Sequence, residues 1–119
     1  MDDGTIFAGI SPDTNKPMYA TPADAPLTYT FNQAQKYAEK LDAHGHKDWR
    51  APTKGELNVL WENRNKGKLK GTFNETGLCP AGWYWSSEQR ANIVSTQRFS
   101  DGRRGADFKD DFSSLRCVR

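Results

Sequence analysis

The chain has 119 residues, enough for one domain spanning 1–119 and too few for a second hydrophobic core. Its 17 basic and 15 acidic residues give a net charge of +2. This balance argues against a dedicated nucleic-acid binder, because such proteins concentrate basic residues on one face. No run approaches the roughly 20 apolar residues needed to cross a bilayer, so we expect no membrane insertion. The acidic start of the chain also lacks the apolar segment of a signal peptide, which leaves the compartment open.

The N-terminal part of the chain predicts a β-hairpin. Residues 5–10 are rich in β-forming side chains, and residues 18–21 can form the returning strand. Between them lies a segment of proline, asparagine and aspartate, the residues typical of turns. Residues 21–26 then read as an ordered surface loop.

Two helices with the same N-terminal signature follow. Thr30 with Gln33, and Thr53 with Glu56, have the spacing of a capping box, in which two backbone N–H groups are satisfied reciprocally. We expect helices over residues 30–44 and 53–64, with Gly45 in the left-handed conformation beyond the first. The apolar stripe of the first helix has helical spacing and consists of Ala34, Tyr37, Ala38 and Leu41.

In the last third of the chain the apolar period shortens to two, which predicts short strands. We expect strands at residues 83–86, 93–99, 105–108 and 115–118, with Trp83 and Trp85 on one face of the first. The order of a hairpin, two helices and a group of strands, without a βαβ repeat, predicts an α+β fold. In this fold the two helices pack on a small, mostly antiparallel, twisted sheet with long loops.

Catalytic and metal-binding motifs are weak in this sequence. His44 and His46 lie close together, but a zinc site needs three or four such ligands. No nucleophile elbow, C-x-x-C pair or H-E-x-x-H motif occurs. We therefore expect a protein that is not an enzyme and that uses no metal or cofactor. Cys79 and Cys117 either form one disulfide or remain reduced.

Four motifs in order resemble one protein family. Residues 48–57, with the sequence DWRAPTKGEL, are similar to the D-W-R-L-P-T-x-x-E-L signature of the Lcl C-terminal (DUF1566) family. YWSS at 84–87, FSDG at 99–102 and RCVR at 116–119 match its further elements. The chain departs from the pattern at Ala51, where Leu or Val is usual, and at Ser95 and Thr96, where an Ala-Trp pair is common.

The resemblance implies a C-type-lectin-like fold and a binding role. Such folds include adhesins, polysaccharide binders and the variable proteins of diversity-generating retroelements, which hold a scaffold constant and diversify residues near the C-terminus. Here residues 89–93 and 103–112 show no regular period and lie between strings that resemble constant framework. The alternative interpretation of both stretches is that they are ordinary loops. The family resemblance also favours a location at the cell surface, outside the cell or on a phage.

These observations predict a module that recognises a protein or carbohydrate ligand through a variable surface. Arginine provides bidentate hydrogen bonds and phenylalanine an apolar anchor, both frequent in binding hot spots. One alternative is an adhesin module for anionic polysaccharide, with Lys66, Lys68 and Lys70 beside two arginines as a cationic patch. Another is a catalyst resembling formylglycine-generating enzyme, which would use Cys79 and Cys117. The expected ligand-binding residues are Arg90, Ala91, Asn92, Ile93, Thr96, Arg103, Arg104, Ala106, Asp107, Phe108, Asp110 and Asp111.

Overall fold

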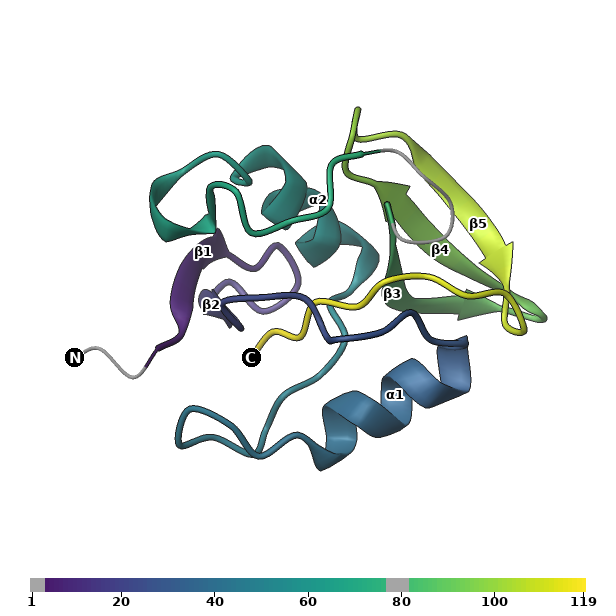
Figure 1. The fold of residues 1–119 in the computed structure, drawn as a ribbon, viewed down its shortest axis with the longest axis horizontal. Helices are drawn as coiled ribbons and strands as arrows, with labels where there is room; N and C mark the ends of the chain where they lie inside the picture. Colours follow the sequence, from purple (N-terminus) through teal and green to yellow (C-terminus); the bar gives the residue numbers. More distant parts are fainter. Residues whose placement is uncertain (1–3, 77–81) are drawn as a thin grey trace.

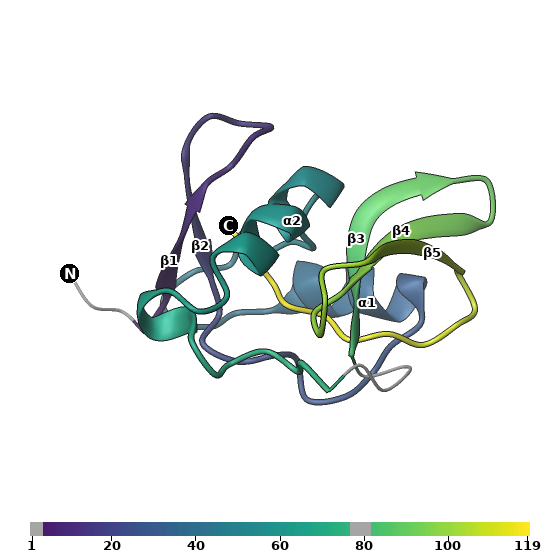
Figure 2. The same ribbon diagram turned by 90° about the horizontal axis from the view of Figure 1, so that it is seen from above.

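The computed structural model describes residues 4–76 and 82–119, and this part of the chain has an α+β fold, as predicted. Figure 1 shows a β-hairpin on one side, a three-stranded sheet on the other, and helix α2 between them; Figure 2 shows the same order from above. The elements in chain order are β1 (Ile6–Ile10), β2 (Pro17–Ala20), α1 (Phe31–Lys40), α2 (Lys54–Glu62), the 3-10 helix η1 (Gly67–Leu69), β3 (Trp83–Arg90), β4 (Ile93–Arg98) and β5 (Arg104–Phe108).

Both sheets are antiparallel. The predicted hairpin is confirmed as β1 paired with β2, and the predicted C-terminal strands form a sheet of order β3-β4-β5. Strand β3 is longer than expected, because residues 89 and 90 continue its pairing with β4 beyond an irregularity after Trp85. The two stretches that lack a sequence period are therefore partly strand, and they are not simple loops.

The predicted strand over residues 115–118 is wrong. This segment is extended, but its backbone pairs in turn with different parts of the chain. Val118 exchanges two hydrogen bonds of 2.9 Å with Arg50, and Arg119 exchanges two with Tyr19. Just before them, Ser114 donates to the Trp83 carbonyl and accepts from the Trp85 N–H. The C-terminal segment thus ties the hairpin to the three-stranded sheet and is not a strand of either.

Both helices begin where the capping boxes predict. The side chains of Thr30 and Thr53 accept from the third helical N–H, and Gln33 and Glu56 accept from the backbone N–H of the cap residue. Helix α2 ends at Glu62, two residues before the predicted end.

Helix α1 ends at Lys40, earlier than predicted. Leu41 is extended, and His44 and Gly45 both have positive φ in a turn that pairs Ala43 with His46. The Trp49 indole donates to the Ala43 carbonyl at 3.1 Å, and both histidine rings pack edge-on against it. The residues expected to extend the helix instead form a turn that holds Trp49 in the core.

The core consists of two clusters that lie on opposite sides of β3. Tyr84 belongs to the first cluster, with Leu57, Leu60 and Phe99, and Trp85 belongs to the second, under α1. The expected alternation along β3 is confirmed, because neighbouring strand residues point to opposite faces. The second cluster comprises Phe31, Ala34, Ala38, Trp49, Ala51, Trp85, Val94, Leu115 and Cys117.

A buried ion pair ties three segments at the edge of the first cluster. The Arg116 guanidinium is fully buried and lies 2.9 Å from the Asp24 carboxylate. It also donates to the Thr72 carbonyl at 2.5 Å and covers the Phe73 ring. The Tyr84 hydroxyl donates to Asp24 at 2.5 Å and accepts from the Asn74 N–H. Since every polar group here has a partner, the network holds the loops around β3 in one arrangement.

Candidate functional site

The end of the three-stranded sheet that carries the β3–β4 turn is its free end. A row of exposed side chains crosses all three strands there. Arg90 is paired with Ile93 across β3 and β4, and Ile93 is paired with Phe108 across β4 and β5. Residues directly opposite each other project from the same face, so the three side chains are neighbours. Ile93 is 39% exposed and Phe108 63% exposed, which is unusual for large apolar residues. The row brings together the two stretches, residues 89–93 and 103–112, that the sequence predicts to carry the ligand-binding side chains.

The opposite face of the same strands is buried at Trp85 and Val94. Val94 and Trp85 pack in the second core cluster, and the Trp85 ring meets Phe31 of α1 edge-on at a centroid distance of 5.9 Å. The Trp85 indole N–H donates to the Tyr29 carbonyl at 2.6 Å. Helix α1 thus covers this face, the lower face of the sheet. The opposite, upper face carries Ile93 and is exposed at the free end.

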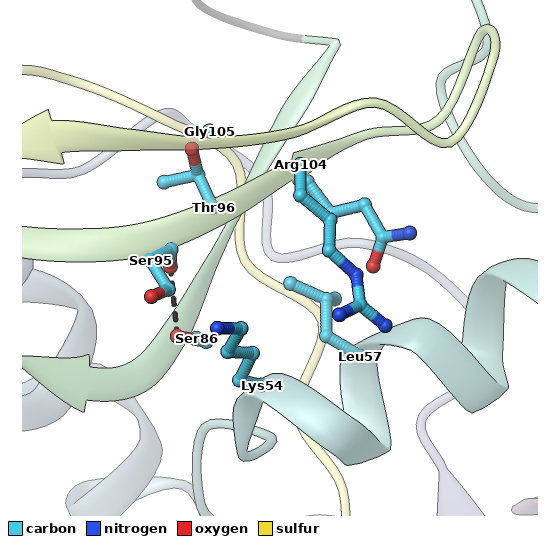
Figure 3. A pocket seen from close by; sticks show the side chains of 8 residues that line it. Lys54, Leu57, Ser86, Ser95, Thr96, Arg104 and Gly105 are labelled. Carbon is cyan, nitrogen blue, oxygen red and sulfur yellow. Dashed lines mark hydrogen bonds between the residues drawn. The ribbon is translucent and has the colours of Figure 1, made fainter.

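A hollow lies between this exposed face and helix α2. It has a volume of about 170 Å³, and Figure 3 shows Lys54 of α2 and Arg104 of β5 reaching into it from opposite sides. Its floor includes Ser86 and Ser95; the Ser86 hydroxyl donates to the Ser95 carbonyl at 2.7 Å. A second hollow, of about 350 Å³, shares Lys54 and Ser95 with the first and extends toward the free end of the sheet. The second hollow is lined by Lys54, Glu88, Gln89, Arg90, Ile93, Val94, Ser95 and Ala106.

The cations around the two hollows are not neutralised within the described part of the chain. Lys54, Arg90 and Arg104 are exposed and form no ion pair with a described residue, and Glu88 is the one acidic side chain that lines either hollow. The nearby Arg98 differs, because it lies 2.6 Å from Asp101. That hydrogen bond, with one from the Arg103 N–H, lowers the pKa of Asp101 to about 2. The exposed face therefore combines an apolar pair with unpaired positive charge.

Most of the expected ligand-binding residues lie on or beside this face. Ala91 and Asn92 form the β3–β4 turn, where Ala91 has a φ of 54°, and Arg103 directly precedes Arg104, the first residue of β5. Asp110 and Asp111 follow β5 in a turn, and the Asp111 carboxylate accepts the Phe108 N–H at 3.0 Å. The structure therefore assigns Asp111 a role in ending the strand.

Two of the expected residues lie on the buried face. Thr96 is only 3% exposed; it is among the residues that line the first hollow, but its pairing with Trp85 places its side chain on the lower face of the sheet. Asp107 is half-buried on that side and accepts a hydrogen bond from Ser113 at 3.3 Å. Burial raises the pKa of the Asp107 carboxyl. Both positions were selected by their place in the chain, which does not reveal the face of a strand whose register is unknown.

The cationic patch expected for a polysaccharide is divided in the structure. Lys68 lies in η1 and Lys66 and Lys70 flank it, whereas Arg103 and Arg104 lie at the start of β5. Both views place these two groups on different sides of α2. The chain thus offers two smaller cationic regions.

The sequence did not predict a ligand-binding role for several residues that line the hollows, among them Lys54, Ser86, Ser95 and Gln97. Ser95 lies in a strand otherwise considered framework, and Lys54 is an ordinary first residue of a capped helix. The one local signal is the alternation along β4, which places Ile93, Ser95 and Gln97 on one face. That Lys54 faces this strand is a tertiary contact with no local signature.

The described residues hold no group of three or more His, Cys, Asp or Glu side chains suited to a metal ion. They also include no helix that is long and apolar enough to cross a membrane. Burial raises the pKa of the Cys117 thiol to about 12, which leaves it protonated and weakly nucleophilic at neutral pH. Cys79, and with it the question of a disulfide, lies outside the described residues.

The comparison with protein families agrees with the motifs. The profile of the Lcl C-terminal domain matches residues 12–119, from the β1–β2 turn to the last residue. The chain belongs to this family. In the Lcl C-terminal domain described here, the match covers both helices, the three-stranded sheet and the C-terminal segment, and strand β1 precedes it. A comparison with curated proteins gave no match.

Proposed function

We propose that this Lcl C-terminal domain is a binding module with a C-type-lectin-like scaffold, and that it recognises proteins through the exposed face of the β3–β4–β5 sheet. The observation behind the proposal is the row Arg90, Ile93 and Phe108, which two separate stretches of chain build on one surface. Exposed aromatic and aliphatic side chains flanked by arginines are typical of protein-binding hot spots. Large apolar side chains exposed on a soluble domain often mark such a surface.

We further propose that this surface is variable, as in the proteins of diversity-generating retroelements. The support is the division of labour within each strand. Side chains on the upper face at the free end contact solvent, whereas Trp85 and Val94 on the lower face fill the core. Substitutions on the exposed face remove few packing contacts, so the domain can accept many of them without losing its fold.

The DNA around the gene tests the variable surface. We expect a reverse-transcriptase gene nearby and a near-copy of the DNA that encodes the end of the chain. Differences between copy and gene should fall on codons for exposed positions such as Arg90, Asn92, Ile93 and Phe108. They should spare the codons for buried Trp85. The absence of a copy, or differences concentrated on buried codons, would refute this part of the proposal.

A stability measurement tests the recognition face itself. Replacing Arg90, Asn92, Arg103 and Ala106 together should change the free energy of unfolding by no more than about 1 kcal/mol, because all four are exposed. A variant with the same number of substitutions on the outer face of α1, at Asn32, Lys36, Glu39 and Lys40, is the matched control. If the sheet variant unfolds while the α1 variant remains stable, the stretches are structural and the recognition face is excluded.

Anionic polysaccharide is the competing ligand class. The divided cationic patch gives it less support, since η1 and β5 lie on different sides of α2. Catalysis like that of formylglycine-generating enzyme has less support still, because it would depend on the buried, protonated Cys117.

A further inference from the structure

Strand β5 has one edge that is open to a further strand. Two backbone hydrogen bonds mark the ends of the β4–β5 ladder. The Arg98 N–H donates to the Arg103 carbonyl at 2.8 Å, and the Lys109 N–H donates to the Asn92 carbonyl at 3.0 Å. Hydrogen-bonded pairs alternate along an antiparallel ladder. The N–H and C=O groups of residues 104, 106 and 108 therefore point away from β4, toward the free edge.

The backbone groups of Arg104 and Ala106 at this edge have no partner in the described part of the chain. Phe108 is different: its N–H donates to the Asp111 carboxylate, and its carbonyl accepts the Asp111 N–H at 3.0 Å. The turn after β5 thus satisfies the outward backbone groups of Phe108 and leaves those of Arg104 and Ala106 open. Unpaired groups of this kind are the template on which an extended peptide adds as a new strand.

The charge around the edge selects the occupant. Arg103 directly precedes β5 and Arg104 begins it, and the Arg104 side chain points onto the hollow beside Lys54. Asp110 and Asp111 follow the other end of the strand, so the positive charge lies at its start. An extended segment with an acidic side chain there would place a carboxylate on the hollow face, next to Arg104 and Lys54. Such charge-assisted contacts are stronger than neutral hydrogen bonds.

We infer that the β5 edge binds an extended, acidic segment of a protein partner, which adds as a fourth strand to the β3–β4–β5 sheet. The inference rests on the proposed recognition face and specifies how it is used. Backbone hydrogen bonds at Arg104 and Ala106 do not depend on the side chains that β5 displays. Lys54 also lies outside the two stretches proposed to vary. The backbone edge and Lys54 are the constant part of the surface, and the exposed side chains at the free end of the sheet, such as Ile93 and Phe108, are the variable part.

The test uses the full chain labelled with ¹⁵N and three synthetic six-residue peptides. The first alternates glutamate and valine, the second replaces each glutamate by glutamine, and the third keeps the first sequence but carries N-methyl groups on alternate amides. We expect the glutamate peptide to shift the amide resonances of Arg104 and Ala106 and to slow their hydrogen exchange. The glutamine and N-methylated peptides should each bind at least roughly tenfold more weakly, because one lacks charge and the other lacks strand donors.

Three variants locate the site on the protein. Ala106→Pro removes an outward N–H and leaves the β4–β5 ladder intact, since proline is tolerated at a strand edge whose N–H faces solvent. It should weaken the glutamate peptide roughly tenfold, as should Arg104→Glu. Lys66→Glu makes the same charge change as Arg104→Glu but lies beside η1, and it should leave the affinity unchanged. Unshifted amide resonances of core residues such as Val94 verify the fold of each variant.

Several results would overturn the inference. These are equal binding of the N-methylated peptide, equal losses in Lys66→Glu and Arg104→Glu, and no binding of the glutamate peptide at millimolar concentration. A sulfated polysaccharide that shifts the same resonances, and is unaffected by Ala106→Pro, would show an anion surface in place of a strand site. The proposed function is refuted by other results: codon differences concentrated on buried positions, or unfolding of the sheet variant while the α1 variant remains stable. The two failures are therefore distinguishable.

Discussion

Replacing Trp85 by alanine tests whether the lower face of the sheet is the scaffold. The side chain is completely buried and packs against Phe31, Val94 and Leu115. Removing a buried tryptophan costs about 3–5 kcal/mol through lost burial and the cavity that remains. The lost hydrogen bond to the Tyr29 carbonyl adds little, because that carbonyl still accepts the Ser113 N–H at 3.0 Å.

The matched comparison is Phe108→Ala on the upper face. Phe108 is mostly exposed, so its truncation should change the free energy of unfolding by no more than about 1 kcal/mol. Trp85→Phe keeps an aromatic ring against Phe31 but loses the N–H donor, and its loss should lie between the two. Domains of this size hold about 5–15 kcal/mol in total, so Trp85→Ala should remain folded but lose a large share of its stability.

Urea unfolding followed by circular dichroism measures all three variants. The midpoint should fall sharply for Trp85→Ala at an unchanged slope, which shows that stability and not the unfolded state has changed. The melting temperature should fall by roughly 12–20 °C, at about 4 °C per kcal/mol. If Phe108→Ala loses more stability than Trp85→Ala, the two faces of the sheet have been assigned the wrong way round.

Three other changes probe the scaffold. The Glu56 carboxyl is desolvated, but hydrogen bonds from Arg50, Ser11 and the Thr53 N–H outweigh this and lower its pKa to about 2. The folded pKa lies below the unfolded one, so this stabilisation is present above about pH 4.5 and is lost toward pH 2. The deficit of Glu56→Gln relative to the wild type in urea unfolding should therefore shrink on acidification, and a constant deficit would contradict the assignment. Arg116→Met leaves the partly buried Asp24 carboxylate without its cation and should cost about 3 kcal/mol by calorimetry. The double variant with Asp24→Asn should recover part of this loss, and no recovery would show that the two residues do not act as a pair. Gly102→Ala should lower the melting temperature, because φ is +79° and the new Cβ would lie 2.4 Å from the Trp61 ring; an unchanged melting temperature would argue against this turn.

The amino-acid sequence by itself determined the local elements of this domain. Both helix starts were predictable because each capping box joins residues only three positions apart, and the structure confirms all four bonds. The hairpin and the paired strands were predictable from turn residues and alternation. The sequence also predicted that Tyr84 and Trp85 lie on opposite faces of the sheet. Side chains alternate between the two faces of any strand, whatever the sheet packs against.

Only the tertiary structure decided the features that depend on distant partners. Helix α1 ends early because the residues after Lys40 form a turn whose Ala43 carbonyl accepts the Trp49 indole N–H. Residues 115–118 are not a strand because their backbone bonds go to several segments in turn. The pairing register placed Thr96 below the sheet, and the packing of α2 placed Lys54 beside the hollow. Each outcome rests on contacts between residues far apart in the chain, and no local pattern of side chains encodes such contacts.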